Sequence, residues 1–569
     1  MKMMKLLFLK YKREKSSLPI LALLLFVSLV PMLALLHPGL PPTHDGEYHI
    51  VRAHQFDKTL HDGSWYPRWQ PDVNFGYGLP LLNYYYPLPY YAISLFHSVG
   101  LSFIDGFKLG MVIAVVAGGI FFYLWSSTFW GRTGGVVSAI FYTFSPYHIV
   151  QVYIRGSAGE LWSLAFFPAC LWAITKLIRE RRGIFAPFAS VFLALLVFSH
   201  NVLAYLFMPF ALSYAIVLIL QYRSIRKTAF QTTVAFLLGI GLSAIFWLPA
   251  LLERNFVTGL QIHNIEEHFP ELYQLLFPSW GSGFSALDLQ NQMSFQIGVA
   301  NLLAIITTLI LVLFFSSQRK GALIMLWFFL SWFFLLFFFM LKVSLSLWKT
   351  IPLLFYSQFP WRLLALEVLI ASFLAGSLLA RWKSLYFAIP FSLFAILLSI
   401  QYTKPAYYLM RGDAYYMTRA NFIDGTNTPG DIFNTIWMNR SLRRQKEKFK
   451  IVSGLGEVRV RSIKATSYKV EVLAKQDLVL SVHTAYFPGW QAFVDGEKTS
   501  VEVNSDGLIQ FRVPKGVHAV AVKFLNTPVR NIATAISFSS LFFLVALLAK
   551  LVRARMERLH EDCDRHLTS

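Results

Sequence analysis

The residues best suited to chemistry form a short segment near the N-terminus, 44–49, with the sequence HDGEYH. Two carboxylates, Asp45 and Glu47, lie between two imidazoles, His44 and His49. Such groups can take up a proton, hold a substrate through hydrogen bonds or ligate a metal ion. The segment is therefore a candidate reaction centre, and the alternative interpretation is an ordinary solvated loop.

Aromatic side chains follow this segment in dense runs. They occur at 65–69 (WYPRW), 76–78 (GYG) and 83–90 (NYYYPLPY). Aromatic rings with a polar edge are typical of the membrane–water interface, and they also suit stacking on sugar rings. Both interpretations remain open from the residues alone.

Two further polar groups lie between apolar stretches farther along the chain. The first is 145–148 (SPYH) with 155–160 (RGSAGE), and the second is 358–362 (QFPWR). The planar fork of an arginine suits a phosphate or pyrophosphate. The alternatives are that Glu160 only caps a helix, where the helix dipole favours an acid, and that each arginine is an ordinary surface residue.

Composition places these groups on a membrane protein. The chain has 569 residues, of which 56% are hydrophobic and 14% charged, and its mean hydropathy is +0.52. Soluble domains carry roughly 25% charged residues, so a soluble enzyme is excluded. The net charge of +21 comes from bases scattered between apolar stretches, which excludes a nucleic-acid partner. The two cysteines, Cys170 and Cys563, indicate neither a disulfide framework nor a metal site.

Basic loops indicate how the helices run. Lysines and arginines concentrate on the cytoplasmic side, so the basic N-terminus lies inside and the first helix, about 17–37, is retained and runs outward. Residues 38–104 form a large outer loop, in which 88–99 is a short surface helix rather than a crossing. The other predicted spans are 105–127, 134–150, 160–178, 185–202, 203–221, 232–252, 296–316, 321–341, 363–381, 384–402 and 530–550. About twelve transmembrane helices with both termini cytoplasmic result, in a plasma membrane.

The segment 403–529 has a different pattern. Short alternating apolar stretches are separated by turn sequences such as Pro488-Gly489, Asp495-Gly496 and Asp506-Gly507. This pattern predicts an antiparallel β-sandwich-like domain, which the span count places outside the membrane. The predicted organisation is a transmembrane domain at 1–402, a β-rich domain at 403–529, and a last helix with a cytoplasmic tail at 530–569.

Taken together, these motifs resemble the GT-C superfamily of membrane glycosyltransferases. They resemble more closely the membrane family labelled pyruvoyl-tetrahydropterin-synthase-related, although nothing in the chain resembles the soluble zinc enzyme of that label. The resemblance implies a GT-C-like fold with an acidic residue in the first outer loop. It implies transfer of a sugar from a polyprenyl-phosphate carrier to a glycan, lipid or protein acceptor at the outer face, with membrane lipids as the surroundings.

The same resemblance implies roles for particular residues. Asp45 would be the general base, with Glu47 as its competitor, and Arg155 and Arg362 would stabilise the leaving phosphate. A divalent metal, if one is used, has candidate ligands in His44, Asp45 and His49, and no other cofactor is implied. The candidate substrate-binding residues are His49, Tyr86, His148, Arg155, Glu160 and Arg362.

Non-enzymatic alternatives remain open at this point. A lipid-linked sugar flippase or transporter would carry ionisable residues near the bilayer midplane, and an assembly scaffold would tolerate loss of the two carboxylates. Here the polar groups gather at the outer ends of the spans, which favours chemistry at the membrane surface. Trp490 and Tyr486 of the β-rich segment are either glycan-stacking residues or part of its core.

Overall fold

Apolar helices account for most of the chain. The computed structural model describes residues 18–222, 225–259, 265–286, 291–314, 320–351, 354, 356–382 and 385–567. Segments in lipid must satisfy their own backbone hydrogen bonds, which favours helices. The apolar helices are α2 (Leu18–Leu29), α5 (Phe103–Thr143), α7 (Ala158–Ile178), α8 (Phe185–Ser199), α9 (Asn201–Tyr222), α10 (Ile225–Leu242), α11 (Ala244–Leu252), α13 (Val299–Phe314), α14 (Lys320–Met340), α17 (Leu364–Trp382), α18 (Leu385–Ser399) and α21 (Pro528–Leu567).

These helices confirm a polytopic membrane protein. Within the described ranges, eight helices are long and apolar enough to cross a membrane, and the pair α10 and α11, bent by 65°, adds a ninth if counted as one span. Helices α8 and α13 are apolar but shorter. Each of the roughly twelve predicted spans coincides with part of a helix. The smaller count arises because some helices are short and because α5 contains two predicted spans.

Helix α5 is a hairpin of two helices. Gly131 interrupts it with φ 72° and ψ −177°. The rings of Phe122 and Tyr142 stack with centroids 4.3 Å apart, and the Ser126 hydroxyl donates to the carbonyl of Gly135 over 3.4 Å. The chain therefore reverses at Gly131, as the two predicted spans require.

The structure corrects the end of the second predicted span of this hairpin, 134–150. The helix ends at Thr143, and a separate short helix, α6 (Pro146–Val150), follows. Pro146 lacks the N–H that would continue the first helix, and it suits the first turn of the next one. A π-helical turn, Gln151–Arg155, then leads to α7.

An outer layer covers one end of the bundle. It contains α3 (Gly46–His61) and α4 (Leu88–Ser98) from the predicted outer loop, with the smaller helices α12 (Leu272–Leu276) and α15 (Leu345–Thr350). Helix α4 has 11 residues, too few for the roughly 20 that a crossing needs. The predicted short helix at 88–99 is therefore present and does not span a membrane.

The β-rich segment is an antiparallel sandwich. One sheet has the order β1-β4-β8-β7 and the other β2-β3-β9-β5-β6. The strands are β1 (Phe449–Ser453), β2 (Gly456–Lys464), β3 (Ser467–Ala474), β4 (Leu478–Ala485), β5 (Trp490–Val494), β6 (Glu497–Thr499), β7 (Glu502–Val503), β8 (Leu508–Val513) and β9 (Gly516–Phe524). Trp490 is 3% exposed and stacks on Tyr468 with centroids 5.3 Å apart, so it belongs to the core.

Residues 403–448 precede the strands and fold over the outer layer. This stretch contains α19 (Asp413–Thr418) and α20 (Ala420–Ile423). Leu409 pairs with Leu40 in a backbone bridge, and the Asp413 carboxylate accepts the backbone N–H of Phe103 over 2.7 Å at the start of α5. The first part of the predicted domain 403–529 thus packs on the helical unit, and the sandwich itself occupies 449–524.

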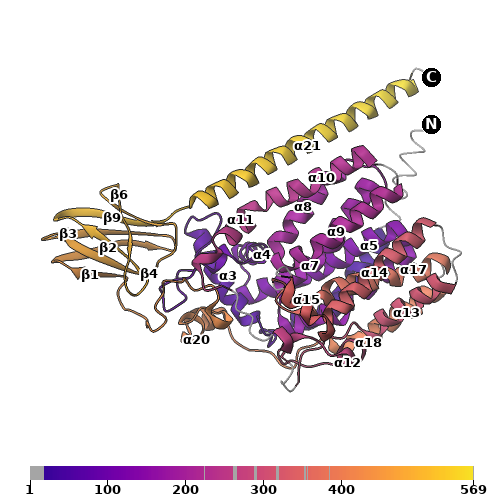
Figure 1. The fold of residues 1–569 in the computed structure, drawn as a ribbon, viewed down its shortest axis with the longest axis horizontal. Helices are drawn as coiled ribbons and strands as arrows, with labels where there is room; N and C mark the ends of the chain where they lie inside the picture. Colours follow the sequence, from indigo (N-terminus) through magenta and orange to yellow (C-terminus); the bar gives the residue numbers. More distant parts are fainter. Residues whose placement is uncertain are drawn as a thin grey trace.

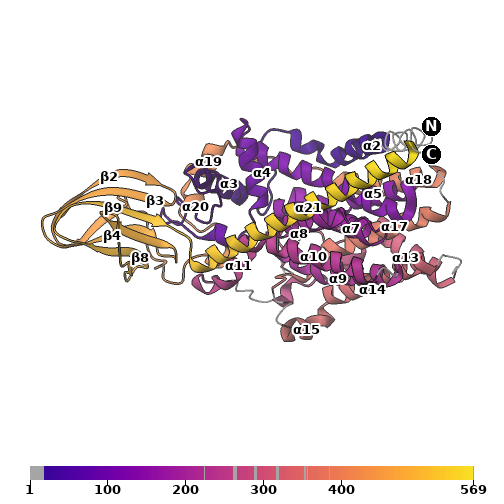
Figure 2. The same ribbon diagram turned by 90° about the horizontal axis from the view of Figure 1, so that it is seen from above.

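The two units lie end to end (Figure 1). The β-sandwich occupies one end, the helical bundle the other, and α3, α4 and α20 lie between them. Helix α21 runs from the sandwich along the bundle to its far end, where α2 begins (Figure 2). The α3 part of the outer layer therefore lies where the bundle meets the sandwich, whereas α12 and α15 lie farther along the bundle (Figure 1).

Candidate functional site

Two backbone contacts place Asp45 beside Arg155. The N–H groups of His44 and Asp45 donate to the carbonyls of Ile154 and Arg155, each over 2.9 Å. Gly156 makes this approach feasible, because it has a φ of +62° and a Cβ added there would lie 2.2 Å from the Thr43 hydroxyl oxygen. The start of α3 and the turn before α7 are therefore locked together.

The Asp45 carboxylate stands at the edge of a buried charged cluster. Its Oδ2 lies 3.9 Å from Nη2 of Arg155, and the Asp45 side chain is 38% exposed whereas that of Arg155 is 8% exposed. Asp45 occupies the N-cap position of α3, but its side chain makes no capping hydrogen bond. A carboxylate in this position is accessible to a substrate and unconstrained by the helix.

Glu160 holds two arginines at once. Its Oε1 lies 2.5 Å from Nη1 of Arg155 and accepts the Nε–H of Arg362 over 3.1 Å. Its Oε2 accepts the hydroxyl of Tyr147 over 2.9 Å. Glu160 is fully buried. One carboxylate thus faces two guanidinium groups, so this cluster, which we call the Glu160 cluster (Tyr147, Arg155, Glu160 and Arg362), keeps an excess positive charge beside Asp45.

Neighbouring groups fix the two guanidinium planes. Arg155 donates to Oε1 of Gln151 over 2.9 Å, and Arg362 donates to the carbonyl of Ser357 over 3.1 Å. The ring of Trp361 lies under both, 4.7 Å from the Arg155 guanidinium carbon and 5.7 Å from that of Arg362. Cation–π contact of this kind stabilises a desolvated cation. Trp361 itself is buried, at 2% exposed, and contacts both arginines.

The inner face of α3 adds a buried layer. His49 and Arg52 follow Asp45 by four and seven positions, which places the three on one helix face. His49 Nδ1 lies 2.8 Å from the Tyr90 hydroxyl, and Arg52 donates to the Tyr85 hydroxyl over 2.9 Å. Burial, reinforced by the charge of Arg52, holds the pKa of His49 well below its usual range. His49 is therefore neutral at pH 7 and supplies no positive charge.

Tyr86 joins this layer and touches the Glu160 cluster through a histidine. Its hydroxyl donates to that of Tyr85 over 3.2 Å, and its ring lies 4.9 Å from that of His200. His200 Nε2 lies 4.0 Å from the Glu160 carboxylate. Tyr86 is 3% exposed, so it supports the wall of the site rather than presenting a free stacking face.

Glu47 faces another direction. Its Oε1 lies 2.8 Å from Nη1 of Arg411, with side chains 28% and 36% exposed. Arg411 lies in the stretch 403–448, which folds over the outer layer. Of the two predicted catalytic acids, Asp45 faces the Glu160 cluster and Glu47 ties down the covering segment.

The three candidate metal ligands do not converge. His44 Nε2 lies 2.9 Å from the carbonyl of Ser282, and its ring packs on Phe284, while His49 is engaged with Tyr90. Across the part of the chain that the structure describes, no group of three His, Cys, Asp or Glu side chains is placed to hold a metal ion. His44, Asp45 and His49 are therefore not placed to bind one metal ion together.

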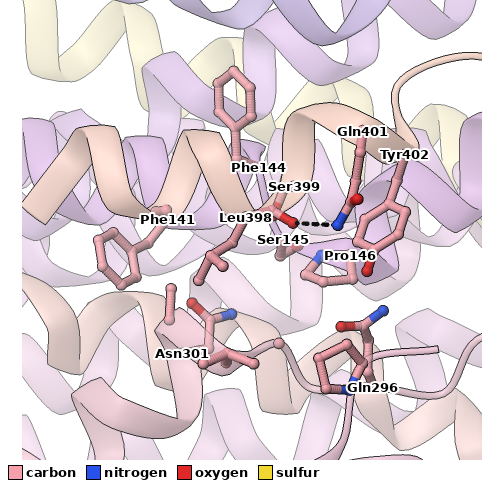
Figure 3. A pocket seen from close by; sticks show the side chains of 15 residues that line it. Phe141, Phe144, Ser145, Pro146, Gln296, Asn301, Leu398, Ser399, Gln401 and Tyr402 are labelled. Atoms are coloured by element: carbon pink, nitrogen blue, oxygen red, sulfur yellow. Dashed lines mark hydrogen bonds between the residues drawn. The ribbon is translucent and has the colours of Figure 1, made fainter. Parts of the chain in front are cut away.

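His148 lies apart from the cluster. Its Nδ1 is 2.9 Å from the Ser145 hydroxyl, and its ring packs edge-on against Tyr142. Next to it, a small cavity of about 50 Å³ lies between α6, α13 and α18 (Figure 3). Its lining includes Ser145, Gln296 and Asn301 but no charged residue. The structure therefore separates His148 from the arginines that it was predicted to support.

Arg52, Gln151 and Trp361 complete the site and were not among the predicted site residues. The spacing 45, 49, 52 on one helix was a usable signal for Arg52. Gln151 precedes Arg155 by four positions and Trp361 directly precedes Arg362, so both stood beside predicted arginines; only the contact of Trp361 with Arg155 depends on the fold.

Comparison with known proteins places the chain in a family. Residues 82–404, more than half of the chain, match the family described as "6-pyruvoyl-tetrahydropterin synthase related domain; membrane protein". An uncharacterised protein of Lactococcus lactis subsp. cremoris is 26% identical over 253 residues, which are 43% of this chain and 40% of that protein. The match thus spans less than half of that relative's length.

Two solved structures match part of the chain. A mutant of the arabinofuranosyltransferase AftD from Mycobacteria is 17% identical with a TM-score of 0.45, over 70% of this chain and 29% of that one. The oligosaccharyltransferase of Archaeoglobus fulgidus is 15% identical with a TM-score of 0.40, over 73% of this chain and 56% of that one. The matched family model covers the Glu160 cluster and the spans that carry it. The chain belongs to the membrane-protein family described as 6-pyruvoyl-tetrahydropterin synthase related.

Proposed function

We propose that the protein is a GT-C-type membrane glycosyltransferase that moves a sugar from a polyprenyl-phosphate carrier to an acceptor at the extracytoplasmic face. One observation carries the proposal. A partly exposed carboxylate, Asp45, stands 3.9 Å from a buried arginine in a cluster with more positive than negative charge. A base for the acceptor and cations for an anionic leaving group are the two requirements of such a transfer.

Asp45 is the general base in this proposal. The acceptor hydroxyl oxygen attacks the anomeric carbon, a new glycosidic bond forms, and the bond from that carbon to the carrier phosphate breaks. The hydroxyl proton passes to Asp45. A positioned base contributes about 10²–10⁴-fold to the rate. Asp45 is favoured over Glu47 because the latter is paired with Arg411 over 2.8 Å.

Arg155 and Arg362 receive the leaving phosphate. Charge-assisted hydrogen bonds from guanidinium groups to phosphate are among the strong ones, and donors fixed before the reaction stabilise charge as it develops. Glu160, fully buried beneath both arginines, is a positioning residue. It holds the two planes in place and leaves part of their charge for the phosphate.

The proposed orientation places the reaction outside the cell. The basic residues near both ends of the chain favour the cytoplasmic side. Helix α2 and the far end of α21 lie at the end of the bundle opposite the β-sandwich (Figure 2). With both termini inside a plasma membrane, the outer layer and the sandwich are extracytoplasmic. The donor would then enter from the membrane and the acceptor, a glycan, lipid or protein, from the outer side.

The test uses the purified full-length protein in lipid nanodiscs. Transfer of radiolabelled sugar from a panel of polyprenyl-phosphate sugars is followed for the wild type, Asp45→Asn and Glu47→Gln, with and without a chelator. We expect transfer by the wild type, a loss of at least 10²-fold in Asp45→Asn with unchanged thermal stability, and near-normal transfer in Glu47→Gln. Equal transfer by wild type and Asp45→Asn would overturn the assignment of the base, and loss on chelation would show a metal requirement.

One observation favours a transporter as the second candidate. Glu367 lies within the span Pro360–Leu379, it is fully buried, and in the described structure neither carboxylate oxygen has a hydrogen-bond partner. A buried acid within a span is typical of transport proteins. If Glu367→Gln stops movement of a lipid-linked sugar across a vesicle membrane while Asp45→Asn does not, the transporter replaces the enzyme.

A further inference from the structure

A second polar site lies between the outer layer and the β-sandwich, away from the Glu160 cluster. It is a pocket of about 210 Å³. Helix α3 and the loop 71–77 form one wall, and the stretch 444–448 with the strands around 463–468 and 483 forms the other. None of the lining residues belongs to the reaction centre proposed above, although α3 carries Asp45 at its other end.

Several contacts hold the two walls together. The Asp62 carboxylate accepts the backbone N–H of Ala465 over 2.7 Å, and the N–H of Ala485 donates to the carbonyl of Tyr77 over 2.8 Å. Lys448 donates from Nζ to the carbonyl of Gly76 over 3.0 Å. The pocket is therefore a built feature of the interface between the two units.

Its lining carries a net positive charge. Five basic side chains line the pocket against two acidic ones, Asp72 and Glu447. Two of the five are already in ion pairs, Lys58 with Asp72 and Arg444 with Asp424 outside the lining. The basic residues are Lys58, Arg444, Lys446, Lys448 and Lys464. A cavity with this balance attracts an anion.

Aromatic rings line the same space. Phe75, Tyr77 and Tyr468 contribute to the wall, and Lys448 Nζ lies 5.1 Å from the Tyr468 ring centroid. Tyr77 is anchored through its hydroxyl, which donates to the carbonyl of Arg443 over 2.9 Å. Tyr77 and Tyr468 are almost wholly buried, at 1% and 2% exposed, and shape the wall, whereas the partly buried Phe75 is the ring that a ring-shaped ligand can contact.

Helix α3 links this pocket to the candidate base. Asp45 stands at its start and Lys58 lines the pocket near its end. Thirteen residues at about 1.5 Å each separate the two by about 20 Å. A chain of several sugar units can therefore reach from one site to the other along the outer layer.

We infer that this pocket binds an anionic saccharide, a carboxylated or phosphorylated sugar unit of the acceptor glycan. The assignment of this saccharide to the acceptor rests on the proposed function, whereas its binding to the pocket does not. The pocket volume lies below the roughly 300–1,000 Å³ of typical small-molecule sites, which suits one charged unit of a longer chain. Cations would pair with its acidic group, and the Phe75 ring would pack against its sugar face.

The test measures equilibrium binding to the full-length protein in nanodiscs of zwitterionic lipid. The probes are trigalacturonate for the carboxylated class, glucose 6-phosphate for the phosphorylated class, neutral maltotriose and inorganic phosphate. The variant is Lys446→Gln combined with Lys448→Gln and Lys464→Gln. The control is Lys498→Gln, because Lys498 is an exposed lysine of the same sandwich outside the pocket.

We expect at least one charged saccharide to bind the wild type and Lys498→Gln equally, and the triple variant at least tenfold more weakly. Whichever charged probe binds identifies the acidic group. Maltotriose should not bind, and inorganic phosphate should bind more weakly than the saccharide. Absence of binding by both charged saccharides, unchanged binding in the triple variant, or phosphate binding as tight as the saccharide would each overturn the inference.

Asp45→Asn separates this inference from the proposed function. It leaves the pocket intact, so it should bind the charged saccharide as the wild type does while losing transfer. If Asp45→Asn retains transfer and binding holds, the proposed base is wrong and the saccharide site stands. If Asp45→Asn abolishes transfer and no saccharide binds, the enzyme proposal stands and the pocket inference fails.

Discussion

Two buried glutamates organise arginines in different ways. Glu160 faces Arg155 and Arg362 and lies beside a partly exposed Asp45. Glu253, at the end of α11, serves one arginine and two polar groups: Arg530 donates from Nε and Nη2 over 3.0 and 2.9 Å, Asn83 over 2.9 Å and Thr527 over 2.5 Å. Arg530 is fully buried and Glu253 2% exposed.

The difference separates a structural ion pair from a reactive cluster. Around Glu253 the cluster holds a second buried arginine, Arg68, which donates to Asn83 and to the carbonyl of Ile245. Every contact there joins elements that must stay together, namely the outer loop, α11 and the start of α21. Around Glu160 positive charge lies beside a carboxylate that water can reach. Buried charges whose partners all lie within the fold stabilise one arrangement, whereas positive charge at an accessible edge is available to a ligand.

The largest effects are expected when either glutamate is replaced. Glu160→Gln and Glu253→Gln each leave a buried guanidinium without its counter-charge, which costs about 3–5 kcal/mol of folding free energy. Denaturant unfolding of the purified variants measures this loss for both. The folded fraction of Glu253→Gln should retain transfer, and that of Glu160→Gln should lose it.

The same pair of variants can break the comparison. If both retain transfer in the folded fraction, the surplus charge at Glu160 has no role in the reaction. If both lose it equally, the Glu253 pair is more than a structural contact.

A smaller effect is expected from Gly156→Ala. The new methyl group would lie 2.2 Å from the Thr43 hydroxyl oxygen at a φ of +62°. The strain should cost about 1–3 kcal/mol and shift Asp45 away from Arg155. A displacement near 1 Å at a reaction centre costs roughly 10²-fold in rate, so transfer should fall more than thermal stability does.

Gly412→Ala is the matched control, because a Cβ there meets nothing within 4 Å. It should change neither transfer nor stability. Equal transfer by Gly156→Ala and Gly412→Ala would show that contact between the two loops does not position Asp45.

Glu47→Gln should have a small effect on stability. The pair with Arg411 is partly exposed on both sides, at 28% and 36%, and such pairs contribute about 0.2–1 kcal/mol. We expect a change of that size in chemical unfolding and transfer within about threefold of the wild type. A loss of transfer as large as that of Asp45→Asn would exchange the roles of the two acids.

The basic pocket should respond to pH between about 6 and 8, because of Lys448. Burial lowers the pKa of Lys448 to about 7, which Asp72 opposes and Lys58 reinforces. Lys448 is therefore charged at pH 6 and mostly neutral at pH 8. Losing one such cation should weaken binding of the charged saccharide by about two- to fivefold.

Binding measured at pH 6 and pH 8 tests this expectation. His483 and Tyr468 also line the pocket beside Lys448. Lys448→Gln should lose most of the pH response. A full response in Lys448→Gln would show that Lys448 does not carry it.

Patterns along the chain predicted the elements well where each element is defined by its own residues. The alternating segments of 403–529 predicted an antiparallel sandwich. The positions of the basic loops, with the shortness of 88–99, predicted a helix that does not cross the membrane. The end of the span 134–150 was not foreseen, although Pro146 was visible in the sequence. An apolar stretch continues through Pro146, and hydropathy alone does not separate a helix that ends from one that kinks.

The residues of the candidate site were likewise predicted correctly in part. Asp45, Arg155, Glu160 and Arg362 were predicted from residue type, and the fold brings them together. The ligand set of His44, Asp45 and His49 relied on nearness in sequence. A helix starting at Gly46 turns His49 inward toward Tyr90, whereas His44, before the helix, faces Ser282.

The sequence by itself determined that the chain is a polytopic membrane protein with a β-sandwich before its last helix. Hydropathy and alternation are properties of single segments, and each segment carries enough of them to fix its own class. Tertiary structure alone decided that Arg362 shares Glu160 with Arg155, 207 residues away, and that Glu47 faces Arg411 while Asp45 does not. Tertiary packing decides which charged side chains become partners, because it decides which of them are buried next to each other.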